Sequence, residues 1–281
     1  MNVSANYETD QNLRTRQGIW AYGAAGPLFR RVLDLVTVPE TAPVVDVGCG
    51  NGNYLGELRR RGHRGPLLGL DLSPGMAATA AAASGVPTGV ADAQFLPIRT
   101  ATARLTLAPH MLYHVPDIPL ATAEIRRITA PGGLAVIVVN SPRHAHEIDT
   151  LLAAVTTDLL GHPVTIIWDG HRFRSDGADA LLPTVFGDVE KHDLGGVAAV
   201  TAASAVRGYV ESLPASALAV PADRRDEVLT EFERRAEARI AADGSFPVTS
   251  RAVAYVCGAS ALRRKSSSAT SRWAATSPPT M

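Results

Sequence analysis

The chain has 281 residues, 46% of them hydrophobic, and its 27 basic and 27 acidic side chains give a formal net charge of zero. This length allows one large domain, or a domain with a cap, around a sizeable core. The balanced charge argues against a nucleic-acid-binding protein, because such proteins usually carry a basic excess or patch.

The cysteines and the first residues of the chain indicate the cellular compartment in which we expect the protein. The two cysteines, Cys49 and Cys257, lie far apart in sequence, so neither a disulfide framework nor a cysteine-rich zinc site is indicated, and a reducing cytoplasm fits. The first eight residues lack the basic and apolar regions of a secretory signal. Because no run approaches the roughly 20 apolar residues of a membrane helix, we expect no membrane partner.

Residues 1–40 precede the first predicted strand, and we expect them to form a helical lid segment. Residues 30–36 are compatible with a helix that packs on a sheet. Tyr7, Arg14 and Trp20 bring aromatic rings and a guanidinium to this segment. An aromatic face can shield a bound cation, and an arginine can pair with a carboxylate. The alternative is a solvated helix with scattered aromatics.

A glycine-rich turn follows the first predicted strand. Residues 44–47 are apolar apart from Asp46 and run straight into Gly48-Cys49-Gly50-Asn51-Gly52, after which residues 54–60 are compatible with a helix. Glycine lets a ligand approach the backbone closely, because it has no Cβ. A dinucleotide fingerprint, G-x-G-x-x-G, would require glycine at position 53, where this chain has Asn53. The turn therefore favours a nucleotide-like ligand other than NAD.

The middle of the chain alternates apolar strands with helices. We predict strands at 67–72, 88–91, 105–108 and 134–139, and helices at 76–84 and 118–128. Continuous apolar runs of this kind indicate a parallel sheet covered on both faces. Right-handed crossovers then bring the carboxyl end of every strand to one edge, where ligands bind in open α/β sheets.

The later third is expected to complete the sheet and to cover that edge. Residues 185–194 and 250–257 read as two further strands, and helical patterns at 202–213 and 224–242 lie between them. We therefore predict a domain over residues 41–260 with a helical cap insertion at about 197–245. The polar, serine-rich residues 261–281 are predicted to be disordered.

Several motifs together resemble those of class I S-adenosylmethionine-dependent methyltransferases. They are the D-x-G-x-G-x-G pattern at 46–52 and the string V-A-D-A-Q-F-L-P-I at 90–98. Residues 108–117 resemble the type-11-like, small-molecule branch of that family. The resemblance implies a Rossmann-like sheet of seven strands, six parallel and the last antiparallel, with helices on both faces. It also implies S-adenosylmethionine as cofactor and S-adenosylhomocysteine as product.

Two aspartates at strand ends are expected to hold the cofactor. Asp71 follows the glycine turn by about 20 residues, where an acidic side chain binds a ribose; its alternative role is a helix N-cap. The resemblance implies that Asp92 takes the adenine amino group while the next amide faces the ring; an ordinary turn aspartate is the alternative. The predicted cofactor-binding set is Tyr7, Arg14, Asp46, Gly48, Gly50, Asp71, Leu72, Asp92, Ala93 and Gln94, with Arg14 opposite the methionine carboxylate.

Histidines are expected on the acceptor side. The resemblance implies that His110, after the fourth strand, lies nearest the transferred methyl, and a histidine there can take a proton from an attacking hydroxyl or amine. His110 is thus the predicted catalytic residue, with a plain wall of the pocket as the alternative. His114 either contacts the acceptor or fixes the start of the next helix.

The turn after the fifth strand is expected to complete the acceptor side. Asn140 and His144, together with Trp20 and the two histidines above, form the predicted substrate-binding set, and residues 172–178 resemble the same branch and are expected to line the pocket. His144 and His146 are two residues apart and would point to different faces of a helix. We therefore predict no metal site.

The motifs predict a methyltransferase that acts on a nitrogen or oxygen of a small molecule, possibly in bacterial specialised, antibiotic-type metabolism. Two alternatives stay open. One is a methyltransferase that acts on RNA or protein, and the other is a protein that binds S-adenosylmethionine without methyl transfer. The predicted partner is a small-molecule acceptor rather than nucleic acid, and the chain is expected to be a monomer or a homodimer.

Overall fold

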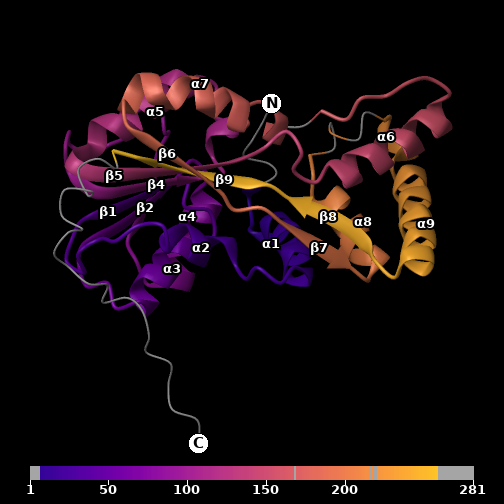
Figure 1. Cartoon of the computed structure of the whole chain (residues 1–281), viewed down its shortest axis with the longest axis horizontal. Helices are drawn as coiled ribbons and strands as arrows, with labels where there is room; N and C mark the ends of the chain where they lie inside the picture. Colours follow the sequence, from indigo (N-terminus) through magenta and orange to yellow (C-terminus); the bar gives the residue numbers. More distant parts are fainter. Residues whose placement is uncertain (1–6, 168, 215–216, 218–219, 259–281) are drawn as a thin grey trace, which may run out of the picture.

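The structure, a computed structural model, describes residues 7–258 apart from 168, 215–216 and 218–219. The tail predicted to be disordered, 261–281, therefore lies outside the described residues. The main sheet consists of β1 (Val44–Val47), β2 (Leu67–Asp71), β3 (Thr88–Val90), β4 (Ala103–Pro109), β5 (Thr129–Asn140), β6 (Val189–Asp193) and β9 (Ala252–Cys257). Their order across the sheet is β3-β2-β1-β4-β5-β9-β6 (Figure 1).

The strand directions confirm the predicted sheet. The pairs β1·β2, β1·β4, β2·β3 and β4·β5 are parallel. β9 runs antiparallel to both of its neighbours, β5 and β6, so β6 points the same way as β1 to β5 and β9 alone is reversed. The carboxyl ends of β1 to β5 consequently meet at one edge, where parallel α/β sheets place their ligands.

Helices cover both faces of the sheet, as the continuous apolar strands require. On one face lie α5 (Ile118–Ile128) and α7 (Ser175–Phe186), and on the other lie α2 (Leu28–Leu33), α3 (Asn53–Arg60) and α4 (Pro74–Ser84) (Figure 1). Alternate residues of the strands point to opposite faces of the sheet. Val45 and Val47 pack with α5, whereas Val44 packs with α2 and α3.

Short local signals set the ends of the helices next to the edge. In α4 the Ser73 hydroxyl accepts the Met76 N–H at 3.2 Å, and Pro74 occupies the first turn, where its missing N–H is not needed. In α5 the Asp117 carboxylate accepts the Leu120 N–H at 2.9 Å. Both caps satisfy amides that have no partner inside the helix, so the two helices begin directly at the sheet edge.

A second group of elements forms a cap beyond the carboxyl edge. It comprises α6 (His146–Leu160), α8 (Ala203–Glu211), α9 (Arg225–Asp243) and a two-stranded antiparallel sheet of β7 (Gly196–Val200) and β8 (Phe246–Ser250). These elements share a hydrophobic core that contains Phe232, Phe246 and Tyr209, and Ile19 of the N-terminal segment packs into it. Figure 1 shows the cap on the right, with α1 (Gln11–Gly18) between it and the sheet.

Three boundaries differ from the sequence predictions. The strand expected at 250–257 is interrupted at Arg251, so that β8 belongs to the cap and β9 to the main sheet. The strand expected at 185–194 begins only at Val189, because α7 continues to Phe186. The insertion predicted to be helical at about 197–245 begins with β7 and is followed by β8, and the alternating side chains of these strands bury one face against α6 and α8. Within the described residues, no helix is both long and apolar enough to cross a membrane.

Candidate active site at the carboxyl edge of the sheet

The glycine turn after β1 forms the floor of the site. Gly48, Gly50 and Gly52 all have positive φ, between 53° and 78°, a conformation that side chains with a Cβ rarely adopt. The amides of Gly48 and Cys49 both donate to the Leu70 carbonyl, at 2.7 and 3.0 Å, which ties the turn to β2. A Cβ on Gly48 would lie 2.6 Å from the Met111 Cβ. Glycine is therefore required here for the turn to fit beneath the chain that leaves β4.

Asp71 fastens the glycine turn to the start of α4. Its carboxylate accepts the Gly50 N–H and the Ser73 N–H, both at 2.9 Å. Burial raises the pKa of Asp71, and these backbone hydrogen bonds oppose the increase. Each carboxylate oxygen can accept more than one hydrogen bond, so the side chain fits the two hydroxyls of a ribose. Ser73 rather than Asp71 is the N-cap of α4, and the ribose role of Asp71 stays a prediction.

Asp46 is a buried carboxyl group beside the same turn. It is fully buried, and neither of its oxygens has a hydrogen-bond partner among the residues that the structure describes. Burial, reinforced by the neighbouring Asp71 charge, raises its pKa well above the ordinary value. A buried acid without a partner is costly, and a cationic group at the turn would compensate it. The raised pKa favours the neutral acid in the protein without ligand, and a cofactor role of Asp46 stays a prediction.

The turn after β3 presents Asp92 at the same edge. Its carboxylate accepts the Gln94 N–H at 2.9 Å and both of its oxygens contact the Gln94 amide nitrogen, at 3.1 and 2.9 Å. Ala93 is buried beside it, whereas Leu72 is 55% exposed at the end of β2. Asp92 is thus a turn aspartate in this structure whose oxygens keep capacity for an amino group. These residues fit an adenine at the rim of the site.

The N-terminal segment closes over the edge through Tyr7. The Tyr7 hydroxyl lies 3.0 Å from His114 Nε2 and 3.1 Å from the Arg16 guanidinium, and its carbonyl accepts the Ser73 hydroxyl at 2.7 Å. Arg16 also donates to the Ser212 carbonyl of the cap. Arg14, the predicted carboxylate partner, is exposed and pairs with Asp10, the residue before its helix, so its role toward the cofactor stays a prediction. Helical geometry turns Arg14 outward while Arg16 faces the site.

His110 leaves β4 in a strained conformation. Its φ is 55°, which is uncommon for a residue with a side chain and is found where surrounding structure enforces it, often at active sites. Burial lowers the pKa of His110 to about 4, and the nearby His114 adds to this effect. His110 is therefore neutral at physiological pH and is a weak proton acceptor.

His144 is the second histidine of the edge, in the turn after β5. Its Nδ1 accepts the Arg251 N–H at 3.1 Å, and its ring centroid lies 5.1 Å from that of Trp20. Burial, followed by the influence of His110, lowers the pKa of His144 to about 3. Trp20 and His144 are thus in contact, and His110 is near enough to influence the pKa of His144; their part in acceptor binding stays a prediction. Asn140 precedes them, and its buried Oδ1 has no hydrogen-bond partner among the described residues.

Some residues of the site were not singled out from the sequence. Arg16 and Met111 take part through the contacts above, and His171 pairs with Asp149 of α6 at 3.1 Å. These contacts join residues that are distant along the chain, and no short motif marks them. A group of three or more side chains suited to a metal ion is absent from the part of the chain that the structure describes.

A prediction follows from the two histidines with lowered pKa values. In the unfolded chain both titrate near 6.5, so below that pH the unfolded state binds more protons than the folded state. Their contribution to stability is complete above pH 6.5 and is lost as the pH falls toward 4 and 3. We expect the free energy of unfolding, measured by urea denaturation, to fall by about 2 to 4 kcal/mol between pH 7 and pH 5.

Substitutions test whether the two histidines cause this loss of stability at low pH. The variants H110N and H144N should each remove part of the fall in the free energy of unfolding, because asparagine does not titrate and tolerates the positive φ of position 110. His162, which is exposed in the loop after α6, offers the control H162N, and its stability should keep the full pH dependence. An unchanged pH dependence in both site variants would contradict the assignment.

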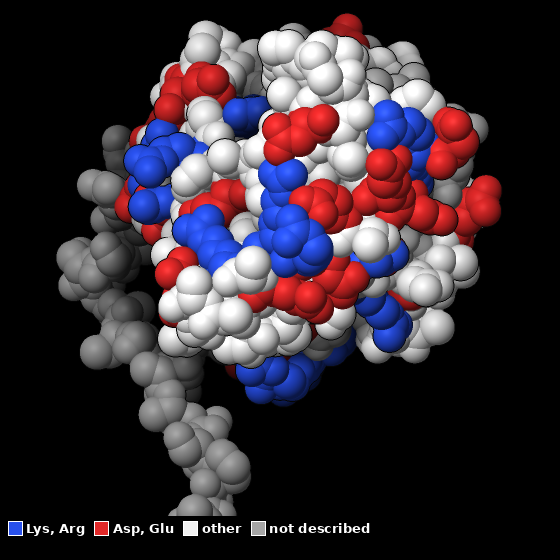
Figure 2. All heavy atoms as spheres, turned by 90° about the vertical axis from the view of Figure 1, so that its right-hand side faces the viewer, with Lys and Arg blue, Asp and Glu red and all other residues white. Residues whose placement is uncertain are grey.

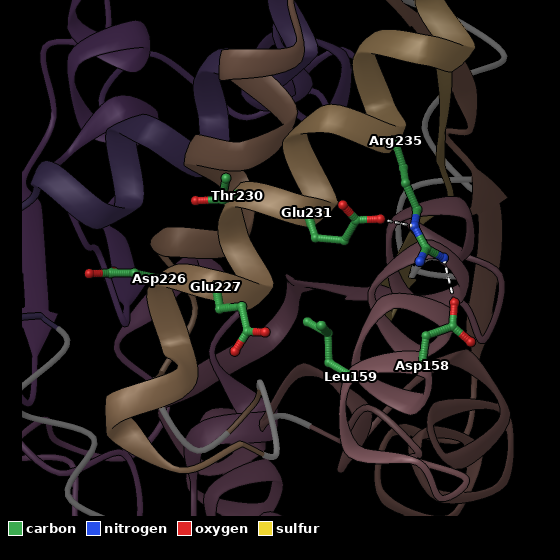
Figure 3. A pocket seen from close by; sticks show the side chains of 7 residues that line it. All are labelled: Asp158, Leu159, Asp226, Glu227, Thr230, Glu231 and Arg235. Carbon is green, nitrogen blue, oxygen red and sulfur yellow. Dashed lines mark hydrogen bonds and ion pairs between the residues drawn. The ribbon is translucent and has the colours of Figure 1, made fainter.

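Away from this site, a depression lies on the outer face of the cap, between α6 and α9. It has a volume of about 480 Å³ and is lined by Asp158, Leu159, Asp226, Glu227, Thr230, Glu231 and Arg235 (Figure 3). Arg235 pairs with Asp158 and Glu231, at 2.8 and 2.7 Å. Figure 2 shows acidic and basic side chains interspersed over this face, without a continuous basic tract. The depression contains none of the residues that surround the glycine turn, and we do not assign it to the reaction.

Comparison with known proteins agrees with this geometry. Residues 45–137 match a family described as "Methyltransferase domain". The chain is 32% identical over 121 residues to the malonyl-[acyl-carrier protein] O-methyltransferase of Serratia marcescens, covering 41% of this chain and 46% of that protein. It is 31% identical over 164 residues to the trans-aconitate 2-methyltransferase of Acidovorax ebreus, covering 56% and 58%. The matches thus span about half of the length of these relatives.

A solved structure shares the fold. It belongs to a candidate methyltransferase from an antibiotic biosynthesis pathway of Anabaena variabilis, with a TM-score of 0.59, 18% sequence identity, and coverage of 81% of this chain and 95% of that one. At this identity the likeness concerns the fold alone. It extends beyond the matched residues 45–137 and therefore includes parts of the chain outside the motif-bearing strands.

Proposed function

We infer that this chain, which carries a class I S-adenosylmethionine-dependent methyltransferase domain, transfers the cofactor's methyl group to a nitrogen or oxygen of a small molecule. The observation that carries this proposal is the carboxylate of Asp71, held at the glycine turn by two backbone amides. Asp92 stands at the end of the neighbouring strand and His110 at the end of β4, so that nucleoside-binding and acceptor-binding groups share one edge.

We propose that the protein contributes mainly by positioning. Bound S-adenosylmethionine supplies a methyl group on a sulfonium, which is already a good leaving group. Asp71 and Asp92 would orient the nucleoside, and Asp46 lies buried behind the same turn. Tyr7, tied to His114 and Ser73, covers the edge and would exclude water. Alignment of donor and acceptor at near-attack distance can supply several kcal/mol of the barrier.

His110 is proposed to contact the acceptor. Its ring is neutral above a pH of about 4, so it can accept a hydrogen bond or a proton without first losing one. We expect H110N to keep the cofactor dissociation constant and to lower kcat/KM by about 10- to 100-fold. Calorimetric titration and a methyl-transfer assay measure the two quantities separately. Unchanged turnover in H110N would remove His110 from the reaction.

The relatives suggest where to look for the acceptor. By name, one of them methylates an oxygen of malonyl-[acyl-carrier protein] and the other methylates trans-aconitate. We propose acids of this kind as the first acceptors to test, and a role in bacterial specialised metabolism remains part of the proposal.

A calorimetric titration and a product assay together test the proposed function. The wild-type protein is expected to bind S-adenosylmethionine and to form S-adenosylhomocysteine when an acceptor is present. No binding would overturn the proposed function. Binding without product in the presence of every acceptor tested would favour a protein that only holds the cofactor, and methylation of RNA or protein alone would favour a macromolecular acceptor.

A further inference from the structure

Two arginines of one short segment reach the two histidine-bearing turns at the sheet edge. The Arg172 Nη1 lies 3.5 Å from the carbonyl oxygen of Tyr113, in the turn that follows His110. The Arg174 Nη1 lies 3.4 Å from the carbonyl oxygen of Pro142, two residues before His144. Phe173, between them, is buried in the main core. The buried Phe173 side chain thus holds the two guanidinium groups at the turns after β4 and β5.

The positive charge of this pair is not neutralised locally. Among the described residues, neither Arg172 nor Arg174 makes an ion pair with a carboxylate. The carboxylates of the adjoining α6 are engaged elsewhere: Asp149 pairs with His171 at 3.1 Å, and Glu147 accepts the Thr249 N–H at 3.0 Å. Within the described part of the chain, both guanidinium groups are therefore available to pair with an anionic ligand.

His144 adds a hydrogen-bond donor of defined direction. Because its Nδ1 accepts the Arg251 N–H, the proton of the neutral ring is on Nε2. The Arg174 Nη1 lies 3.4 Å from the Pro142 carbonyl oxygen, two residues before this ring, and its charge helps to lower the pKa of His144. Trp20 packs on the ring and limits its rotation. A guanidinium beside a neutral imidazole N–H is a set of donors without an acceptor, and its complement is an anionic oxygen.

We propose that the acceptor is a carboxylic acid whose ionised carboxylate, held by the Arg174 guanidinium and the Nε2–H of His144, receives the methyl group on its free oxygen. This inference rests on the proposed function and names its substrate class. A lone pair of the carboxylate oxygen forms the new C–O bond while the C–S bond breaks and its electron pair stays on sulfur. The products are a methyl ester and S-adenosylhomocysteine, and Arg172 adds positive charge at the neighbouring turn.

This chemistry agrees with the character of the histidines. An ionised carboxylate has no proton to lose, so the reaction needs no general base. His110 is neutral and weakly basic, and His114 is already hydrogen-bonded to Tyr7. Positioning residues rather than proton acceptors would then surround the reacting oxygen.

The test compares acids with their uncharged counterparts. Wild-type protein is supplied with methyl-labelled S-adenosylmethionine and either a pool of carboxylic acids (cinnamic, indole-3-acetic, adipic and octanoic) or the pool of their primary amides. We expect label in the acid pool alone, in products from which mild alkali releases labelled methanol. In parallel, calorimetry of the enzyme–S-adenosylhomocysteine complex should detect binding of acids and not of amides.

Matched variants locate the binding groups. R174Q is expected to weaken acid binding by about 10- to 100-fold, because it removes a charge-assisted hydrogen bond, while the affinity for S-adenosylmethionine stays unchanged. R143Q, at an exposed arginine of the same turn, is the control and should behave as wild type.

Three results would overturn the carboxylic-acid proposal. The first is that acids neither accept label nor bind better than amides. The second is an alkali-stable methyl group on an amine or phenol, in which case the proposed function still stands. The third is acid binding that is unaffected by R174Q. A wild-type protein that does not bind S-adenosylmethionine would instead overturn the proposed function.

Discussion

Replacement of Asp71 by alanine is expected to weaken S-adenosylmethionine binding by roughly 100-fold or more. The carboxylate would accept hydrogen bonds from the ribose hydroxyls, and hydrogen bonds to a charged group contribute about 1.5 to 3 kcal/mol each. The same side chain fixes the Gly50 amide, at 2.9 Å, so the substitution also loosens the glycine turn. Calorimetric titration of the cofactor into wild type and D71A measures the effect.

Two companion variants separate binding from structure. S73A removes the α4 cap and the Tyr7 contact but keeps the carboxylate, and should lose less affinity than D71A. D92A is expected to lose about 10-fold, because the Gln94 side chain already occupies part of that carboxylate. Urea denaturation checks that D71A remains folded. Cofactor affinity within a factor of about three of wild type in folded D71A would contradict the ribose role.

The substitution Gly48→Ala is expected to destabilise the protein by about 2 to 5 kcal/mol and to abolish cofactor binding. The φ of Gly48 is 68°, and the strain of an L side chain there costs about 1 to 2 kcal/mol. The added Cβ would also lie 2.6 Å from the Met111 Cβ and 2.9 Å from its Cγ, and overpacking costs a further 1 to 3 kcal/mol. Displacement of Met111 moves the adjoining His110.

Gly85 offers a matched control for this prediction. It ends α4 with a φ of 66°, and a Cβ there would meet no atom within 4 Å. G85A should therefore show the backbone strain without the clash, a loss of about 1 kcal/mol, and an unchanged cofactor affinity. Equal free energies of unfolding for the two variants would mean that the Met111 contact does not restrict this turn.

The main sheet and its ligand edge could be predicted because their signals are local. Val44–Val47 and Leu67–Asp71 are short apolar strands that end at a glycine turn and at an aspartate. The hydrophobic period and the turn residues are enough to predict strands of a parallel sheet. Parallel strands then place Asp71 and Asp92 at one edge, whatever the rest of the chain does.

The cap could be predicted only in part. Its helices α8 and α9 were predicted from helical patterns, but β7 and β8 were not, because each strand is short and pairs with a segment more than forty residues away along the chain. The strand expected at 250–257 is divided at Arg251 for the same reason: Thr249 bonds the cap through Glu147, whereas Ala252 pairs with Asn140 of β5. The division depends on contacts rather than on local propensity.

By itself, the sequence determined the glycine turn, the two aspartates and the parallel strands that bring them to one edge. Only the tertiary structure decided the acceptor side. It turned Arg14 away and Arg16 inward, joined Tyr7 to His114 across 107 residues, and placed the proton of His144 on Nε2 through Arg251. Local pattern sets secondary structure, whereas the partners and protonation of a polar side chain depend on which distant groups are buried beside it.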